Sequence, residues 1–277
     1  MPRPTPDPNA PAWTSNWTAT TGLASPRPVY VRVFDYPKGY YGNFHRHQFA
    51  QLVYSLRGVA SVHTDTGRWL ASPLRAVAIP SWENHRVGAE GNTLLHSVFI
   101  DPAVYPDTIT QFGVLPISSL LHALIQEAGQ YYSDYEQDSL AQRLLELIIA
   151  LLQRCKIDAR IKQLPEIKHP RIRKAVKECI DEKMQSKEIA ARAAFSPRQF
   201  SRVFKADTGM QFKDWRALYQ VQQGMRLLQQ GLTVNQVADR LGFNSASAFI
   251  ALFKRNAGVT PMAILQESSQ PKHSDSQ

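Results

Sequence analysis

Three histidines in the first third of the chain have the type and spacing that metal and ligand sites use. His45 and His47 lie two residues apart in FHRHQFAQLVYSLRG, and His85 lies in IPSWENHRV. Side chains two residues apart on a strand point to the same face, so we expect His45 and His47 together, with Gln51 beside them if the strand continues. Imidazole binds zinc and nickel well, whereas a neutral amide is a poor ligand.

These histidines leave two interpretations open. In the first, His45, His47 and His85 hold a divalent metal, zinc or nickel, and water completes the coordination shell. In the second, they line a pocket for an organic ligand or are hydrogen-bonded parts of the fold. Both interpretations place a candidate effector site at these residues and Gln51.

A duplicated segment near the C-terminus carries a second kind of chemistry. Residues 196–209 read SPRQFSRVFKADTG and residues 245–258 read SASAFIALFKRNAG, and Ser, two Phe, Lys and Gly recur at matching positions. Each copy follows a short helical stretch, EIAARAAF (188–195) or QVADRLGF (236–243). Two copies of helix, turn and helix predict two helix-turn-helix units, which typically place a helix in the DNA major groove.

The second helix of the first copy combines an apolar back with a basic front. Ser196 suits the N-cap, Pro197 suits the first helical position, and Phe200, Val203 and Phe204 share the face that should be buried. Arginine can bridge guanine with two hydrogen bonds, and lysine neutralises phosphate. The alternative is an ordinary solvated helix face. We expect DNA contacts from Arg198, Gln199, Ser201, Arg202 and Lys205.

The second copy has small residues where the first has arginines. Ser245 can cap its helix, and an alanine there could touch a thymine methyl group. We expect this helix to contribute less base discrimination and more positioning on the DNA backbone. Its candidate contacts are Ser247, Ala248, Ala251, Lys254 and Arg255.

The segment between the copies, residues 211–231, predicts one long helix. Trp215, Leu218, Met225 and Leu228 form its apolar stripe. About 18 residues at 1.5 Å each make a rod of roughly 27 Å. Such a rod could hold the two reading helices in successive major grooves, about 34 Å apart.

Charge and composition agree with a polyanion partner. Residues 169–277 carry 17 Lys and Arg against 9 Asp and Glu, whereas residues 1–168 carry 15 against 14. Two cysteines do not make a disulfide framework, the N-terminus has no apolar signal region, and no apolar stretch is long enough to span a membrane. We expect a cytoplasmic protein with no membrane partner.

The remaining pattern predicts an α+β protein of two domains. Short strands from Val29 to about Ile100 are typical of an antiparallel barrel or sandwich. We expect a disordered segment at 1–28, an effector-sensing barrel with a helical hairpin at 29–155, a linker at 156–170, a double helix-turn-helix domain at 171–265 and a disordered tail at 266–277.

The predicted helical hairpin, 117–131 and 137–155, has two leucine stripes. Either both stripes pack on the barrel, or one of them forms the seam of a homodimer. The first stripe comprises Leu120, Leu121, Leu124 and Ile125, and the second comprises Leu140, Leu144, Leu147 and Leu151.

The stretch LGFNSASAFIALFKRNAGVTP (241–261) closely resembles the C-terminal signature of AraC/XylS-type bacterial transcription regulators. The resemblance covers roughly residues 170–265 and implies seven helices, base contacts from the two forward faces, promoter DNA as partner and, for an activator, RNA polymerase. Three departures stand out. Ala248 and Ala251 replace an aromatic or histidine and a basic residue, Ile264-Leu265 replaces Tyr-Arg, and the connection at 181–190 is shorter than usual.

The first half resembles the cupin barrel motif, in H-x-H followed by Gly58 and in the spacing from Pro80 to His85. Metal-binding cupins have a glutamate where this chain has Gln51 and commonly a glycine where it has Trp82. The resemblance implies a barrel that senses a small molecule or metal and supports dimer formation.

Together these patterns predict a sequence-specific DNA-binding transcription regulator, not an enzyme, controlled by a small-molecule or metal effector in the barrel. Two alternatives remain. One is a metal-dependent cupin enzyme, an oxygenase or isomerase, with a DNA-binding appendage. The other is a non-specific nucleoid protein.

Overall fold

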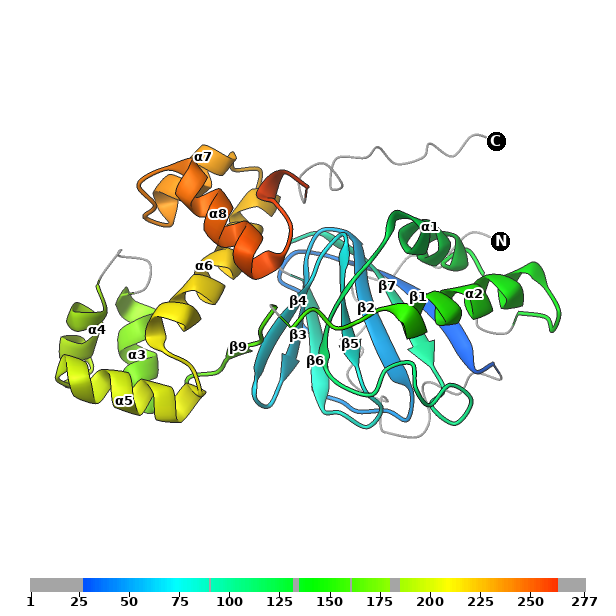
Figure 1. Ribbon diagram of the computed structural model, residues 1–277, viewed down its shortest axis with the longest axis horizontal. Coiled ribbons are helices and arrows are strands. Elements are labelled where there is room, and N and C mark those ends of the chain that lie inside the picture. The colour runs from blue at the N-terminus through cyan, green and yellow to red at the C-terminus, as the bar shows by residue number, and fades with distance from the viewer. Residues whose placement is uncertain (1–26, 90, 132–134, 160, 180–184, 264–277) are drawn as a thin grey trace. The chain divides into compact units, whose positions relative to one another are not determined.

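The computed structural model describes residues 27–263 except 90, 132–134, 160 and 180–184 (Figure 1). The disordered segment expected at 1–28 falls almost wholly outside these residues, and the tail expected at 266–277 falls entirely outside them. The chain divides into two compact units. The first reaches Asp65 and resumes at Ala71–Ile157, and the second comprises Thr66–Leu70 and the chain from Asp158 onward.

The first unit is built on antiparallel strands, as expected. Five strands form one sheet in the order β1-β7-β2-β5-β8, and β3 pairs with β6. Within the described residues these strands do not close into a single barrel. The strands are β1 (Val29–Tyr36), β2 (Ala50–Arg57), β3 (Ala60–Thr64), β5 (Arg75–Ile79), β6 (His85–Ala89), β7 (Thr93–Ile100) and β8 (Gly113–Pro116).

Strand β2 lies in the middle of the larger sheet, between β7 and β5, and is mostly apolar. Its first six residues are buried, and Leu52 and Tyr54 belong to the main core of the unit. Val98 of β7 is the register partner of both Val31 in β1 and Leu52 in β2. This central position brings Gln51, the second residue of β2, into the interior.

Two helices pack on this sheet. Helix α1 (Ser119–Ala128) begins at the N-cap Ser118, and α2 (Leu140–Arg154) begins at Ser139; each serine side chain accepts a backbone N–H of the first turn. Helix α1 contacts β1 and β7, and α2 contacts β1 (Figure 1). Both helices lie within the ranges that the leucine periodicity predicts.

The leucine stripe predicted on α2 lies mainly on its outer face. Leu140 is 69% exposed and Leu147 is 45% exposed. Leu144 and Leu151 are partly buried at the edge of the core. The residues that pack inward are Ala141, Leu145, Ile148, Ile149 and Leu152. The α2 stripe is therefore divided, since Leu144 and Leu151 pack against the core while Leu140 and Leu147 are exposed.

The second unit is helical apart from β4 (Gly67–Ala71, of which Gly67–Leu70 fall in this unit), which pairs with β9 (Leu164–Pro165). Helix α6 has 18 residues, as its apolar stripe predicts, and Trp215, Leu218, Met225 and Leu228 are all buried. The helices are α3 (Pro170–Cys179), α4 (Ser186–Arg192), α5 (Pro197–Thr208), α6 (Phe212–Gln229), α7 (Val234–Arg240) and α8 (Ala246–Ala257). Residues 261–263 are also helical, and the rest of the implied seventh helix lies beyond the described chain.

The segment expected to be a linker is packed in its second half. Leu164 and Ile167 are buried in the core of the second unit. The indole N–H of Trp215 donates to the carbonyl oxygen of Pro165 at 2.8 Å. The backbone N–H groups of Lys168 and His169 both donate to the Asp207 carboxylate. Residues 164–169 therefore belong to the helical unit.

None of the helices in the described chain combines the length and apolarity needed to cross a membrane.

Candidate functional site

Helix α5 presents the basic face that the sequence predicts. The Ser196 side chain accepts the N–H of Gln199 as N-cap, Pro197 stands at the first position, and Gly209 ends the helix with a φ of 71°. Phe200 and Phe204 are buried. The predicted contact residues are all exposed, namely Arg198, Gln199, Ser201, Arg202 and Lys205.

Gln199 also helps to cap its own helix, a role that its sequence position did not reveal. Its Oε1 accepts hydrogen bonds from the backbone N–H and the hydroxyl of Ser196, which completes a capping box. A capping box satisfies two backbone donors at a helix start. The side chain is therefore held at the start of α5, beside Arg198.

Helix α8 repeats this framework with a different outer face. Ser245 caps it, Phe249 and Phe253 are buried, and Gly258 ends it with a φ of 74°. Its exposed residues include the predicted ones, namely Ser247, Ala248, Ala251, Lys254 and Arg255. The two helices therefore share caps and buried phenylalanines, while only α5 carries arginines on its first two turns.

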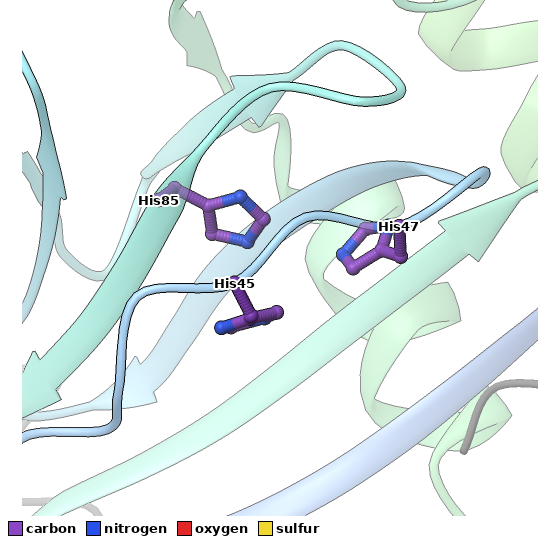
Figure 2. Close-up of side chains that lie close together, drawn as sticks. All are labelled: His45, His47 and His85. Carbon is purple, nitrogen blue, oxygen red and sulfur yellow. The ribbon is translucent and has the colours of Figure 1, made fainter. Parts of the chain in front are cut away.

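The three histidines of the first unit come together in space (Figure 2). One ring nitrogen from each of His45, His47 and His85 lies within 4.8 Å of the others. His85 begins β6, whereas His45 and His47 precede β2 in a segment that runs antiparallel to β6. The backbones of His45 and His85 exchange two hydrogen bonds, of 2.8 and 2.9 Å.

The strand predicted to carry His45 and His47 is shorter than expected. Regular β2 begins at Ala50, and His45 forms only an isolated bridge. The carbonyl of His47 instead accepts the N–H of Trp82, whose φ is 64°. Glycine adopts that left-handed conformation without strain, so Trp82 holds this position of the motif at a cost in backbone energy.

Each histidine ring has one nitrogen held by the backbone. A carbonyl oxygen can only accept, so in the neutral ring Nδ1 carries the hydrogen and Nε2 keeps its lone pair. Burial lowers the pKa of His47, and it lowers the pKa of His85 to about 3, so both rings are neutral near pH 7. The acceptors of His45, His47 and His85 are the carbonyl oxygens of Asn43, Phe49 and Glu83, at 3.0, 2.8 and 2.8 Å.

Gln51 lies against two of these rings. Its Oε1 is 3.2 Å from Nε2 of His47 and 3.1 Å from Nε2 of His85, and its Nε2 donates to Ser97 Oγ at 3.0 Å. Gln51 is 4% exposed and Ser97 is fully buried. Sequence reasoning found Gln51 but missed Ser97; the signal for it was a serine inside the apolar strand TLLHSVFI, since a buried hydroxyl needs a partner.

Below the cluster the interior is aromatic. The ring of His47 contacts Phe99 with a centroid distance of 5.6 Å, and Phe99 stacks on Tyr30 at 5.1 Å. His47 and His85 are 5% and 1% exposed, while His45 is half-buried. A ligand at the cluster would therefore have an apolar floor and three imidazoles that can each offer a lone pair.

Family models match both units. A model described as an AraC-like ligand binding domain matches residues 28–166, half of the chain, and a model described as a helix-turn-helix domain matches residues 167–267.

Two relatives match over most of their length. The HTH-type transcriptional regulator NimR of Escherichia coli is 29% identical over 78% of this chain and 80% of its own. The probable transcriptional regulator LumQ of Photobacterium leiognathi is 21% identical over 79% of this chain and 90% of its own. Among solved structures, ToxT from Vibrio cholerae aligns with 88% of this chain and 99% of its own at 12% identity, with a TM-score of 0.36.

Proposed function

We propose, for a chain that belongs to the AraC family of DNA-binding transcription regulators, that helix α5 supplies most of the base discrimination and α8 mainly positions the domain on DNA. The observation that carries this proposal is the contrast between the outer faces of the two helices. Arg198 and Arg202 stand one turn apart on α5, where α8 has Ser247 and Ala251. Arginine can read guanine, whereas alanine offers only a methyl contact.

The positive charge of the second unit supports the same partner. Lys205 on α5 and Lys254 and Arg255 on α8 are exposed near the ends of their helices. Contacts from such residues to phosphate hold the protein in register without reading sequence. These contacts favour double-stranded promoter DNA as the partner. Such a regulator acts in the cytoplasm. If it activates transcription, RNA polymerase is a further partner.

The first unit receives the effector at the histidine cluster. Buried neutral imidazoles fit a divalent metal such as zinc or nickel, and a small molecule could equally use them as hydrogen-bond acceptors. If a metal is bound, it supplies a Lewis-acidic point at which a ligand is held. The role is binding and not turnover, in keeping with relatives named as transcriptional regulators.

The strand that pairs with His85 continues along the chain into the second unit. His85 is the register partner of Thr64 in β3, and the residues that follow, Thr66–Leu70, belong to the helical unit. Arg68 in that segment hydrogen-bonds to Gln222 of α6. An effector that favours one arrangement of His85 thus has a short path to α6, and it would act by shifting populations of conformations.

Homodimer formation involves the outer face of α2. Leu140, Leu144, Leu147 and Leu151 alternate at spacings of four and three residues, which is the spacing of a two-helix seam. Leu140 and Leu147 are exposed on a helix whose opposite face fills the core, and a second copy of this helix would bury them.

Genome-wide mapping of bound DNA followed by footprinting of the full chain tests the proposed function. We expect bounded footprints that cover two successive major-groove segments. Protection without sequence boundaries would instead identify a non-specific nucleoid protein. Measured turnover of a small substrate at the histidine cluster would restore the enzyme alternative.

A further inference from the structure

Helix α8 carries an exposed isoleucine that the contacts predicted for this helix do not include. Ile250 is 36% exposed, and it lies between the buried Phe249 and the exposed Ala251. A single apolar side chain on a protein surface is common and by itself indicates no partner. The place of Ile250 in the duplication is what distinguishes it.

The duplication puts Ile250 in the outer stripe of α8. On α5 the exposed stripe follows the helical spacing i, i+3, i+4 and i+7, so its side chains share one face. Its members are Arg198, Ser201, Arg202 and Lys205. The matching residues of α8, all exposed as well, are Ser247, Ile250, Ala251 and Lys254. Ile250 therefore occupies the position at which α5 has a candidate DNA contact.

The matching serine also contributes to the fold of the first copy. The hydroxyl of Ser201 donates to Oε1 of Gln211, the N-cap residue of α6, at 3.4 Å. Thr260 matches Gln211 in the second copy, and its hydroxyl oxygen accepts the backbone N–H of Ala263 at 3.3 Å. Isoleucine has no group that could donate to Thr260. At this position the second copy therefore presents apolar surface in place of a hydrogen-bonded hydroxyl.

The outer stripe of α8 is uncharged over its first two turns. Ser247 offers a hydroxyl, Ile250 a branched hydrocarbon and Ala251 a methyl group. The base edges in the major groove are hydrogen-bonding groups with one exception, the C5-methyl group of thymine. An apolar side chain laid on a polar base edge removes water from that edge without replacing its hydrogen bonds, which is unfavourable. The stripe is therefore complementary to thymine and to no other base.

We propose that Ile250 gives α8 a preference for thymine at one base pair, by packing against the C5-methyl group with Ala251 beside it. The proposal rests on the proposed function, in which α8 contacts the major groove, and it adds a limited base preference to the positioning role of this helix. Burial of one methyl group changes Kd about fourfold. An arginine–guanine contact discriminates more strongly, so α5 remains the main reader.

The test replaces each thymine of the footprinted site in turn by deoxyuridine, which lacks the methyl group but keeps the same pairing edge and O4. Fluorescence anisotropy of the full chain gives Kd for each duplex. We expect one thymine at which deoxyuridine raises Kd about three- to fourfold. It should lie about 10 base pairs from the base pair whose preference Arg202→Ala relaxes, because the two reading helices enter successive major grooves. The absence of a methyl-dependent thymine in that segment overturns the proposal.

Two variants assign the methyl dependence to this side chain. Ile250→Ser introduces the residue of the first copy, so the thymine and deoxyuridine duplexes should then bind within about 1.5-fold of each other. Ile250→Val keeps a branched apolar group and should retain most of the difference. Methyl dependence that persists in Ile250→Ser would contradict the assignment to Ile250.

A matched control removes another exposed apolar side chain from the same unit. Met262 is 53% exposed and lies outside α8, so Met262→Ser should leave the methyl dependence unchanged. Circular dichroism checks the folding of each variant, and if Ile250→Ser does not fold, the deoxyuridine series and Ile250→Val decide.

The same duplexes keep two kinds of failure apart. Protection without sequence boundaries refutes the proposed function itself. A bounded footprint with an Arg202-dependent base pair, but with no methyl-dependent thymine one turn away, refutes only the role of Ile250.

Discussion

The guanidinium of Arg171 in α3 donates hydrogen bonds to the carbonyl oxygen of Ala193 at 2.9 and 2.6 Å, where α4 ends. It also donates to Ala194 at 2.6 Å and lies 4.4 Å from the ring centre of Phe195. Gln220 in α6 occupies the corresponding place in the second copy and donates to the carbonyl of Leu241 at 3.2 Å, where α7 ends. The duplication therefore contains three helices per copy, because the first helix of each copy caps the second.

Arg171→Ala should destabilise the helical unit. It leaves two helix-end carbonyls without their charged donor, and we expect a loss of about 1–2 kcal/mol in the free energy of unfolding. Gln220→Ala should cost less, about 0.5–1 kcal/mol, because its donor is neutral. Urea unfolding of the full chain measures both, with Arg173→Ala on the exposed face of α3 as control. Equal stability of Arg171→Ala and Arg173→Ala would contradict the capping role.

Ala194 and Gly242 allow opposite substitutions at equivalent positions of the two copies. They occupy the same turn in the two copies and both have positive φ, 56° and 80°. A left-handed alanine is strained, whereas glycine is not, so Ala194→Gly should stabilise the unit by about 0.5 kcal/mol and Gly242→Ala should destabilise it by about 1 kcal/mol. Thermal unfolding reports both shifts, and the same sign for both variants would refute this explanation.

Arg202 and Lys205 should differ in kind as DNA contacts. Arg202→Ala is expected to weaken specific binding by about 1–3 kcal/mol and to relax preference at one base pair. Lys205→Ala should weaken binding to all sequences and reduce the salt slope by about one unit. Electrophoretic or fluorescence titrations over a range of salt separate the two effects. If Arg202→Ala keeps full site discrimination, the assignment of the α5 groove face is wrong.

The same titrations compare the two reading helices. Because Ala251 offers only a methyl group, Ala251→Gly should change discrimination far less than Arg202→Ala does, by under about 1 kcal/mol. A larger effect from Ala251→Gly would place base reading in α8 and reverse the proposed division of labour.

Leu147→Glu should weaken the dimer without unfolding the first unit. The side chain is 45% exposed on the face of α2 away from the core, so a charge there costs little in the monomer but would be buried in a helix seam. Sedimentation of the full chain is expected to show a shift toward monomer. Glu146→Gln, a change at the exposed neighbour, serves as control, and an unaltered mass for Leu147→Glu would rule out this seam.

Local sequence patterns predicted the structure correctly where the effect of a residue does not depend on partners distant in the chain. The strands 29–36 and 93–100 follow from apolar runs and have the expected bounds, and the 18-residue helix α6 lies within the expected range 211–231. The caps Ser196 and Ser245 and the left-handed Gly209 and Gly258 follow from their side chains. The three histidines also lie close together, as the resemblance to the cupin motif implies, although His45 and His47 precede the regular strand.

Partners distant in sequence could not be read in this way. The leucine periodicity of α2 is correct, but only the packed helix shows that Leu145 and Ile148 face the core while Leu140 and Leu147 face outward, because two apolar stripes compete for one interior. Short β9 lies in a segment whose polar composition predicts a linker; its pairing depends on β4, almost 100 residues earlier.

The sequence by itself determined the family, the duplication and the unequal outer faces of α5 and α8, since these depend on residue types at fixed helical spacing. The tertiary structure alone decided which atoms oppose one another. Backbone carbonyls hold Nδ1 of each histidine, and Ser97, 46 residues from Gln51, accepts a hydrogen bond from the Gln51 amide. A hydrogen bond has a direction that a residue type does not reveal, so the charge and lone pairs of the site could be counted only after the chain had folded.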